Sequence, residues 1–539
     1  MKKTLRRLAG LGLSAALLCT SALALTTDEL GTILQNEYAG DIPSQVWSQT
    51  TVEGMLSALG DPFTRYYTAQ EYAAFQDAVN QGGGAGTSVE ASASGDVGVM
   101  RIHSFGQDTY DRMAQAVEQN KTVDHWLVDL RGCRGGELRA TADALSVFAG
   151  GGELIYLRDK AGKLYSAKSV HSKLTLYPTI VLVDENTASA AELFAGGIRD
   201  RQMGLVIGSR TYGKGVAQSA FDQDHATYGA AFADGSALLL TTEKAFSDNL
   251  SSPNIMGVLP HLAVEPGQAE AVARLLCADA PAADTSGYLR LHLARWRWYI
   301  DLKTADKTAL KALLEALPPQ ALLYAGTGGE DHWSQTSPAD VAAGQGIALD
   351  SRSFADVTGS PYSDAINALK TYGIVQGDEA GNFKPSQGLD RASLCALLAQ
   401  AMNFPRSTAQ PAFADTPADA WYTPYVTTLS AMGIVNGYDD GLFHPNDPIP
   451  HQQFMTILSR IVSSVNASSY GAWQAGPSEE ALADGAYAAY DAWAVKGAWL
   501  LDGAWHAEAR DIDPRAVTTR EEAAYDLWSA LSTMGLLPG

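Results

Sequence analysis

Cysteine and basic charge are both scarce in this chain of 539 residues. Of its four cysteines, only Cys133, Cys277 and Cys395 lie beyond residue 24, and they are too few and too widely spaced for a disulfide framework or a zinc site. We therefore expect free or buried thiols. Lysine and arginine number 38 against 60 acidic residues, which gives a net charge of -22. This balance argues against a nucleic-acid partner, because the phosphates would be repelled.

A long apolar run is also missing, even at the amino terminus. Residues 1–24 have a basic start, an apolar middle and an Ala-Leu-Ala ending, which together predict a signal peptide cleaved after Ala24. The apolar part falls short of the ~20 residues that a membrane span needs. Cys19 follows Leu18 rather than a small residue, which disfavours a lipoprotein. We therefore expect an exported protein.

The remaining composition is that of ordinary folded domains. Hydrophobic residues make up 46% and charged residues 18%, and the length suggests roughly three or four domains. In the first half, "VDHWLVDLRGCRGGEL" and "YPTIVLVDENTASAAELFAGGIRD" read as strands that end in polar or glycine-rich turns, the second followed by a helix. Strands alternating with helices predict an α/β layer with its reactive groups on the loops after the strands.

Ser189 lies on such a loop, and two interpretations compete for it. Ser189 and Glu192 have the spacing of a capping box, which alone would explain a serine at a helix start. Lys214, between two glycines in an otherwise apolar region, favours chemistry instead, because an amine held away from water loses its proton more easily. Gln218 is four residues further on and would share a side of an extended strand with it.

Serine and lysine suffice for acyl transfer. A neutral lysine amine can take the proton of the serine hydroxyl. Lowering a lysine pKa from 10.4 to about 7 takes roughly 4.6 kcal/mol, which burial can supply. The Ala190 amide at the helix start and a glycine amide from Gly135 or Gly136 could hold the developing oxyanion.

The last third of the chain is internally repeated. "SFADVTGSPYSDAINALKTYGIVQGDEAGNFKP" is echoed by "AFADTPADAWYTPYVTTLSAMGIVNGYDDGLFHP", and a weaker third copy includes "TTREEAAYDLWSAL". Each unit predicts two helices around a Gly-Asp-rich turn, a unit that buries its apolar face against its neighbours.

These repeats resemble S-layer homology domains, which hold exported proteins to cell-wall polysaccharide. The resemblance implies that Arg391 and Arg520 occupy the arginine position of that family's Thr-Arg-Ala-Glu motif and bind an anionic glycan, a task suited to a planar cation with five donors. A surface charge at a helix start is the alternative for each. The second repeat has His451 at this position, preceded by a proline.

The first half resembles the carboxyl-terminal processing peptidases, also called tail-specific proteases. "GMLSALGDPFTRYY", "DLRGCRGG", "TASAAE" and "YGKGVAQ" occur in that family's order over most of residues 27–265. The resemblance implies a crotonase/Clp-protease-like α/β fold in which Ser189 is the nucleophile and Lys214 the general base. It also implies that Gln218 orients the lysine and that Ala190 with Gly135 or Gly136 forms the oxyanion hole. No metal or cofactor is implied.

Two departures from the family stand out. The turn reads Gly132-Cys133-Arg134 where the family usually has Asn-Asn-Pro, and only about sixteen residues fill the place of the usual PDZ domain. The expected division is a signal peptide at 1–24, a helical region at 25–80, a catalytic α/β domain at 81–265, a helical region and linker at 266–350, and S-layer homology repeats at 351–405, 410–465 and, in degenerate form, 480–537.

The sequence thus predicts a serine endopeptidase with a Ser-Lys dyad, secreted and attached to the cell wall, that acts on proteins or peptides. Three other possibilities stay open: an inactive binding protein on the peptidase scaffold, a crotonase-type hydratase or thioesterase, and a histidine base, His103 or His225. The sequence identifies neither the substrate, nor the wall glycan, nor the oligomeric state.

Overall fold

The computed structural model describes residues 25–80, 88–175, 178–254, 256–350, 353–404, 406–407, 410–483, 485, 487–504 and 513–538. The predicted signal peptide lies outside these ranges. Within them, no helix combines the length and the apolar character needed to cross a membrane.

A mostly parallel sheet of six strands forms the centre of the α/β domain. Across the sheet, its strands are β11 (Leu262–Ala263), β8 (Gly204–Gly208), β7 (Thr179–Val183), β4 (His125–Asp129), β3 (Val97–Ile102) and β2 (Val89–Ser94). Only the β2–β3 pair is antiparallel. Strands β7 and β8 are buried along their whole length, as expected for parallel strands covered on both faces.

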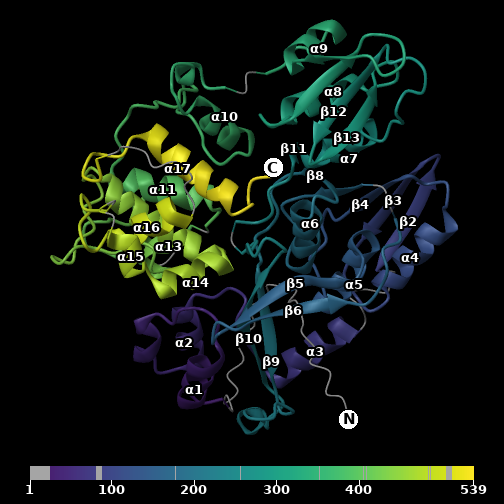
Figure 1. Ribbon diagram of the computed structural model, residues 1–539. Coiled ribbons are helices and arrows are strands. Elements are labelled where there is room, and N and C mark those ends of the chain that lie inside the picture. Colours follow the sequence, from purple (N-terminus) through teal and green to yellow (C-terminus); the bar gives the residue numbers. More distant parts are fainter. Residues whose placement is uncertain are drawn as a thin grey trace.

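Helices cover both faces of this sheet (Figure 1). They are α4 (Thr109–Gln119), α5 (Leu138–Ala149) and α6 (Ala190–Asp200) on one face, and α7 (Pro266–Leu275) and α8 (Lys307–Ala316) on the other. The predicted α/β fold is confirmed, and the loops after the parallel strands open at one edge, where ligands bind in such sheets.

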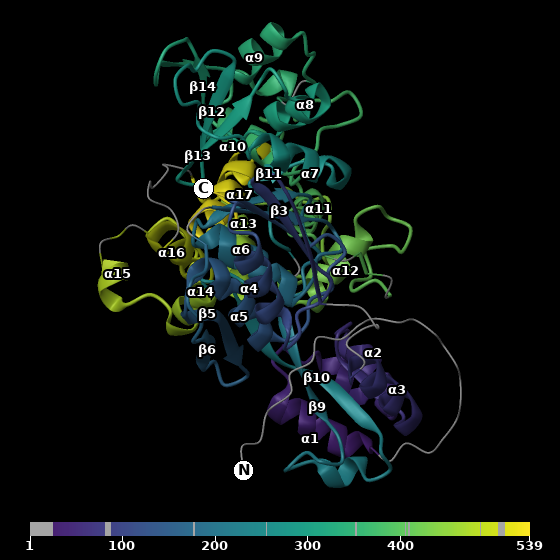
Figure 2. The ribbon, with the colours of Figure 1, turned by 90° about the vertical axis from the view of Figure 1, so that its right-hand side faces the viewer.

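A second, antiparallel sheet carries the amino-terminal region. Its strands are β1 (Arg65–Tyr67), β5 (Gly152–Asp159), β6 (Leu164–Ser169), β9 (Val216–Phe221) and β10 (Ala237–Phe246). The helices of the amino-terminal region lie beside this sheet (Figure 2). They are α1 (Thr27–Glu37), η1 (Ser44–Ser48), α2 (Val52–Leu59) and α3 (Ala69–Asn80). Leu30 and Met55 pack with Phe221 and Leu240 into one small core. The amino-terminal region therefore packs against β9 and β10, the strands that follow Lys214.

The connection from α3 to β2 is too short for another domain. Helix α3 ends at Asn80 and β2 begins at Val89, which leaves residues 81–88 between them. Domains take about 50 residues or more. No PDZ domain fits at this point of the chain.

The prediction of a helical region and linker at 266–350 is wrong in part, although the polar–apolar alternation of residues 289–302 suggests one strand there. Helices α7 and α8 are present, but a four-stranded antiparallel sheet accompanies them, and the predicted linker contains a strand and a helix. These elements are β12 (Tyr288–Leu293), β13 (Trp296–Asp301), β14 (Leu322–Gly326), β15 (Trp333–Thr336) and α9 (Pro338–Gln345). Leu291 and Trp298 of this four-stranded sheet share a core with Leu182 of the central six-stranded sheet. The region is therefore a layer of the peptidase body.

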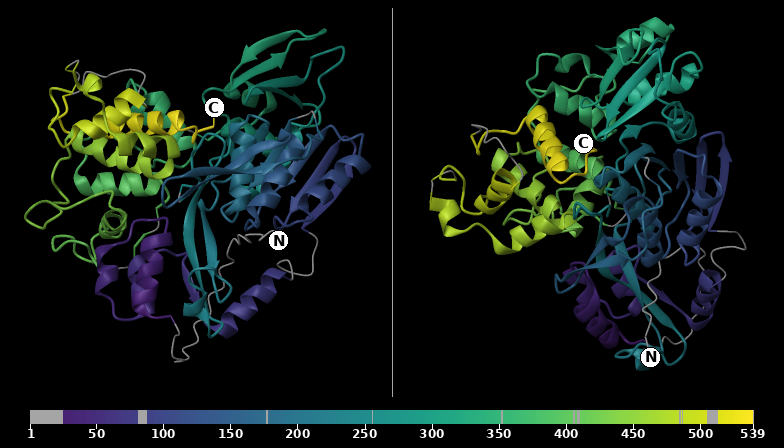
Figure 3. Two further views of the ribbon diagram at one scale, coloured as in Figure 1. Left: turned by 60° about the horizontal axis from the view of Figure 1, so that its bottom comes forward. Right: turned by 45° about the vertical axis from the view of Figure 1, so that its right-hand side comes forward.

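The carboxyl-terminal part is a helical module with one continuous core (Figure 3). Its helices and 3₁₀ turn are η3 (Ala355–Val357), α10 (Ser363–Thr371), α11 (Arg391–Ala401), α12 (Thr423–Ala431), α13 (His451–Val465), α14 (Ala467–Ala475), α15 (Glu479–Ala483), α16 (Val495–Ala504) and α17 (Arg520–Thr533). Leu394, Ile461 and Leu527, from α11, α13 and α17, lie in that core. Met256 and Leu259 of the α/β domain lie in it too, so the core crosses from the module into the peptidase body.

The segments before α11, α13 and α17 meet in a closed triangle of backbone hydrogen bonds. The Leu389 N–H donates to the Thr518 carbonyl at 2.9 Å, the Thr518 N–H to the Ile449 carbonyl at 2.9 Å, and the Ile449 N–H to the Leu389 carbonyl at 3.0 Å. Three chain segments that are far apart in sequence therefore have equivalent places around one axis.

Candidate active site

Three loops at the carboxyl ends of parallel strands form the candidate site. They are residues 130–136 after β4, residues 184–189 after β7 and residues 209–215 after β8. They carry Gly135 and Gly136, Ser189 and Lys214, so the fold gathers the predicted catalytic residues at one edge of the sheet.

Ser189 lies at the strand-to-helix turn that begins α6. It is 5% exposed, and its backbone has φ 58° and ψ -123°. One half of the predicted capping box is present, because the Glu192 carboxylate accepts the Ser189 N–H at 2.8 Å, while the Glu192 N–H donates to the Ser189 backbone carbonyl at 2.9 Å. An ordinary capping residue, however, has extended backbone angles, and a serine at positive φ is strained. Capping alone therefore does not explain this turn, whereas a nucleophile presented at a sharp turn does.

Glu192 joins the serine turn to the lysine loop, a role that the sequence did not predict. One carboxylate oxygen accepts the backbone N–H of Ser189 at 2.8 Å and that of Lys214 at 2.7 Å. The other accepts the Gly213 N–H at 2.7 Å and the Thr211 hydroxyl at 2.6 Å. A single fully buried carboxylate thus holds the backbones of Ser189 and Lys214 side by side.

The charge of Glu192 depends on a balance of burial and hydrogen bonds. Burial raises the pKa of Glu192 to about 7, while the donors from Thr211, Gly213, Lys214 and Ser189 act in the opposite direction. The Glu192 carboxylate accepts four hydrogen bonds and donates none, which suits its ionised form. Glu192 lies in the "TASAAE" motif, and the capping-box spacing pointed to one of these four contacts.

Lys214 is buried beside the amino-terminal region. Its side chain is 5% exposed, and the amine lies 5.0 Å from the centre of the Phe63 ring. Burial lowers the pKa of the Lys214 amine to about 8, although the charges of Asp61 and Glu192 favour the protonated form. Asp61 and Phe63 belong to the "GDPFTRYY" motif, so this motif helps to enclose the amine.

The backbones of the predicted dyad are held together by Glu192, but their side chains are not joined. In the described part of the chain, no hydrogen bond links the Ser189 hydroxyl to the Lys214 amine. Contacts of this kind often tighten only when substrate binds.

Gln218 does not hold the lysine as the strand alternation suggested. Its side-chain amide donates to the Thr241 hydroxyl at 3.2 Å, and among the described residues no hydrogen bond joins it to Lys214. The alternation argument fails because Lys214 lies in the loop before β9, which begins at Val216. Gln218 is nevertheless buried, at 3% exposure.

Of the two predicted oxyanion glycines, Gly135 lies against the start of α6 and Gly136 lies against the backbone of Phe105. Gly135 has φ 99° and Gly136 has φ 152°. A Cβ on Gly135 would stand 2.9 Å from the Ala190 nitrogen and 2.8 Å from the Ala188 carbonyl, so only glycine fits there. Over the described residues, the N–H groups of Ala190 and Gly136 have no hydrogen-bond acceptor. Such donors are free to bind a developing oxyanion.

Gly132 and Cys133, which stand where the resembled family usually has Asn-Asn, hold this turn against the loop after β7. The Gly132 N–H donates to Asp184 at 2.9 Å, and the Cys133 carbonyl accepts the Ala188 N–H at 2.9 Å. Burial raises the pKa of the Cys133 thiol to about 12. Cys133, Cys277 and Cys395 are all free and buried, which confirms the prediction for the thiols.

The two candidate histidine bases lie elsewhere. His103 faces Glu90 at 3.3 Å, and His225 accepts backbone N–H groups of its own loop and stacks on Phe221. Among the described contacts, neither reaches Ser189. Lys214, by contrast, is tied to Ser189 through Glu192, whose carboxylate accepts the backbone N–H of both residues.

Arg391 is occupied inside the carboxyl-terminal module. Its guanidinium donates to the carbonyls of Phe443 and Asn436 at 2.9 and 3.0 Å and to the Gln453 side chain at 3.1 Å. The side chain is 6% exposed and lies over the Tyr438 ring. This arginine joins the first repeat to the turn of the second, and little of it is left for a ligand.

Arg520 makes the equivalent contact around the axis but is less enclosed. Its guanidinium donates to the Phe383 carbonyl at 2.7 Å and to the Gln376 carbonyl at 3.4 Å, in the turn of the first repeat. His451 stands at the corresponding place in the second repeat, where its backbone N–H, not its side chain, donates to the Ala516 carbonyl at 2.9 Å. The arginine position thus links each repeat to the next.

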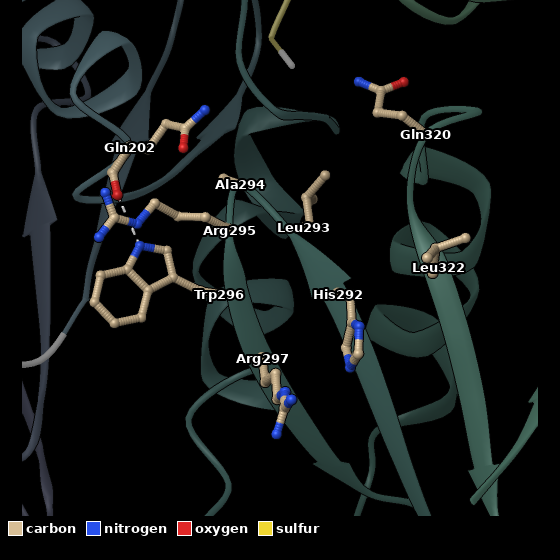
Figure 4. Close-up of a pocket in the computed structure, with 9 residues that line it drawn as sticks. All are labelled: Gln202, His292, Leu293, Ala294, Arg295, Trp296, Arg297, Gln320 and Leu322. Atoms are coloured by element: carbon tan, nitrogen blue, oxygen red, sulfur yellow. Dashed lines mark hydrogen bonds between the residues drawn. The ribbon is translucent and has the colours of Figure 1, made fainter.

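A hollow of about 530 Å³ lies outside this site, at the tip of the β12–β13 hairpin (Figure 4). There the Trp296 indole N–H donates to the Gln202 carbonyl at 2.8 Å. None of the residues that line the hollow belongs to the three loops described above.

A strained serine at a helix start, a buried lysine and unpaired amide donors are the components of a hydrolase that uses nucleophilic catalysis. Comparison with known proteins identifies the families. Residues 96–264 match the family model "Peptidase family S41", and residues 353–395 and 412–455 match "S-layer homology domain". The chain carries a peptidase domain of that family followed by S-layer homology domains.

Individual relatives match only parts of the chain. Carboxyl-terminal-processing peptidase 3, chloroplastic, of Arabidopsis thaliana is 30% identical over 179 residues, which are 32% of this chain and 33% of that protein. The S-layer protein sap of Bacillus anthracis is 33% identical over 114 residues, 21% of this chain and 14% of that protein. The solved photosystem II D1 C-terminal processing protease is 18% identical with a TM-score of 0.37, and the match covers 48% of this chain and 99% of that one. The chain thus spans about a third of its peptidase relative.

Proposed function

We propose that this chain is a secreted serine endopeptidase of the carboxyl-terminal processing type, held at the cell wall by its S-layer homology repeats. One observation carries the catalytic part of the proposal: the Glu192 carboxylate holds the backbone amides of Ser189 and Lys214 on the same oxygen. A capping serine has no need of a buried lysine beside it, whereas a nucleophile does.

The proposed reaction proceeds through an acyl-enzyme. The neutral Lys214 amine takes the proton from the Ser189 hydroxyl as its oxygen attacks the peptide carbonyl. The amides of Ala190 and of Gly135 or Gly136 hold the oxyanion. The lysine ammonium then gives its proton to the leaving amine. Water, activated by the same amine, releases the acyl group and restores the serine.

The decisive experiment compares peptide-bond hydrolysis and fluorophosphonate labelling in wild type and four variants. Ser189→Ala, Lys214→Ala and the double variant should lose hydrolysis to the same extent, because the two residues act as a unit. Lys214→Arg should fail as well, since a guanidinium keeps its proton near neutral pH. If either lysine variant hydrolyses peptides at the wild-type rate, the dyad is wrong. If wild type neither hydrolyses peptides nor takes the label, the inactive-scaffold alternative gains instead.

Attachment to the wall is proposed from the repeats. The full chain should sediment with purified cell-wall sacculi and be displaced by free wall polysaccharide. Arg520→Ala should weaken binding more than Arg391→Ala at equal folded fraction, because the Arg391 guanidinium is already enclosed by protein groups. A full chain that stays in the supernatant would contradict the attachment.

A further inference from the structure

A short stretch of chain connects the lysine loop to the S-layer homology module. We define the bridging segment as residues 247–254, which follow β10. On one side it contacts Gly215, the residue after Lys214, and on the other it contacts the carboxyl ends of α13 and α17. The bridging segment is therefore an element shared by the two parts of the molecule.

On the catalytic side, the bridging segment grips Gly215 through two side chains. The Ser252 hydroxyl donates to the Gly215 carbonyl at 3.2 Å, and the Gly215 N–H donates to the Asn254 side-chain oxygen at 3.3 Å. A Cβ on Gly215 would stand 2.3 Å from both the Ser252 hydroxyl oxygen and the Asn254 nitrogen. The backbone beside Lys214 is thus packed directly against the segment.

On the other side, the bridging segment satisfies the carbonyls at two helix ends. The Ser252 N–H donates to the carbonyl of Val465, the last residue of α13, at 2.8 Å. The Ser251 hydroxyl donates at 2.6 Å to the carbonyl of Met534, which caps α17, and accepts a hydrogen bond from Asn466 at 2.9 Å. Carbonyls at helix ends lack partners within their own helix, so these contacts fix both helices to the segment.

The two sets of contacts meet in a single residue. Ser252 uses its backbone N–H toward the module and its hydroxyl toward Gly215, and it is completely buried. Its neighbour Ser251 contacts the module and is 1% exposed. Since the Lys214 amine has no hydrogen bond within the described part of the chain, its position depends on how its backbone is held. Glu192 fixes that backbone from one side and the bridging segment from the other.

We propose that Ser252 and Asn254 are positioning residues for Lys214, and that the S-layer homology module is the support from which they act. The module then has a role in the reaction besides attachment. This inference rests on the proposed function, because it assigns the lysine its task. Misplacing a catalytic group by about 1 Å can cost on the order of a hundred-fold in rate, so contacts to the residue that follows Lys214 are worth testing.

The test uses the full chain with Ser252→Ala and Asn254→Ala, and Gln320→Ala as the matched control. The Gln320 side chain donates at 2.6 Å to the carbonyl of Pro538, near the end of the same module, but does not touch the bridging segment. We expect kcat to fall about ten- to a hundred-fold in the first two variants with little change in KM, and to stay at the wild-type value in the control. Asn254 is only half-buried, so its variant tests the contact even if Ser252→Ala does not fold.

A second readout separates this inference from the proposed function. The titration of the Lys214 amine, followed by NMR on lysine-labelled full chain, should move toward the ordinary lysine range in Ser252→Ala and Asn254→Ala but not in Gln320→Ala. Unchanged kcat and unchanged titration in a folded Asn254→Ala variant overturn the inference. A wild type without hydrolysis overturns the proposed function, while the lysine titration still decides whether the segment positions the amine.

Discussion

Ser189 combines two features that its sequence context presents as alternatives. The Glu192 half of the capping box is present, yet the Ser189 backbone lies at positive φ, where a capping serine has no reason to be. The same carboxylate also accepts the amide of Lys214. The cap and the proposed nucleophile therefore depend on the same contacts.

Burial of the Lys214 amine should lower the stability of the fold, because the protonated form is buried away from water. Its pKa is about 8 in the folded chain and near 10.5 when exposed. Between these values the unfolded chain holds a proton that the folded chain has released, so stability rises with pH in this window and the full penalty applies below pH 8. At 1.36 kcal/mol per pKa unit the penalty is about 3 kcal/mol.

Lys214→Met should therefore abolish hydrolysis and raise the free energy of unfolding at pH 7 by up to about 3 kcal/mol, with the gain fading between pH 8 and 10.5. Urea unfolding at pH 7 and pH 10 measures this. Lys163→Met, at an exposed position, should change neither quantity. If Lys214→Met is no more stable than wild type at pH 7, the Lys214 amine does not have a pKa lowered by burial.

Replacing the Glu192 carboxylate should damage fold and reaction together. In Glu192→Gln, one oxygen becomes an NH₂ group that faces two existing donors, and leaving buried partners unsatisfied costs about 1 to 3 kcal/mol each. We expect a loss of about 2 to 4 kcal/mol in the free energy of unfolding and a severe loss of kcat in whatever folds. Glu185→Gln, at an exposed position in the loop before α6, is the control. Equal stability of the two variants would refute this role for Glu192.

The sequence predicted individual residues better than it predicted their partners. Ser189 and Lys214 stood out because a hydroxyl and an amine are unusual in apolar surroundings. The four contacts of Glu192 involve residues up to 22 positions away, which no local pattern reveals. The expected contact between Gln218 and Lys214 failed because a strand period was applied across the start of a strand.

Among the elements, the turn after β4 depends most on its glycines. Gly135→Ala would add a Cβ 2.8 Å from the Ala188 carbonyl and 2.9 Å from the Ala190 nitrogen, at a φ of 99°. We expect a large fall in kcat with a smaller effect on KM, because the distortion falls on the amides that would hold the oxyanion. Steady-state kinetics measure this, and Gly132→Ala, where nothing lies within 4 Å of the added Cβ, separates backbone strain from the clash. Equal kinetics in both variants would contradict the assignment.

Strands and helices were predictable where their patterns were strong. Strand β7, which is apolar after Thr179, could be predicted directly from the sequence, as could the paired helices of the repeats. In the sheet at 288–336, the alternation of residues 289–302 suggests a strand, but the hairpin and the later strands could not be predicted. Its first hairpin turns at Ala294 and Arg295, both at positive φ, where glycine or asparagine would have signalled a turn. Its last strand, β15, is only four residues long.

At the scale of the whole molecule, the missing PDZ domain leads to a prediction about substrates. Residues 81–88 cannot hold the domain that in the resembled family grips substrate carboxyl termini. Unfolded protein substrates should therefore be cleaved at nearly the same kcat/KM whether their carboxyl terminus is free or amidated. A large loss of kcat/KM on amidation would mean that another part of the chain recognises the tail.

The closed triangle of Leu389, Ile449 and Thr518 has a consequence for copy number. Open arrays of repeats can gain or lose a unit at either end, because each unit touches only its neighbours. A ring has no end at which to add one. A fourth unit would have to break a hydrogen bond of the triangle, and the loss of any unit would leave one N–H and one carbonyl without partners. Geometry therefore fixes the number of segments in this ring at three, so that the module can diversify by substitution and by loop length but not by duplication.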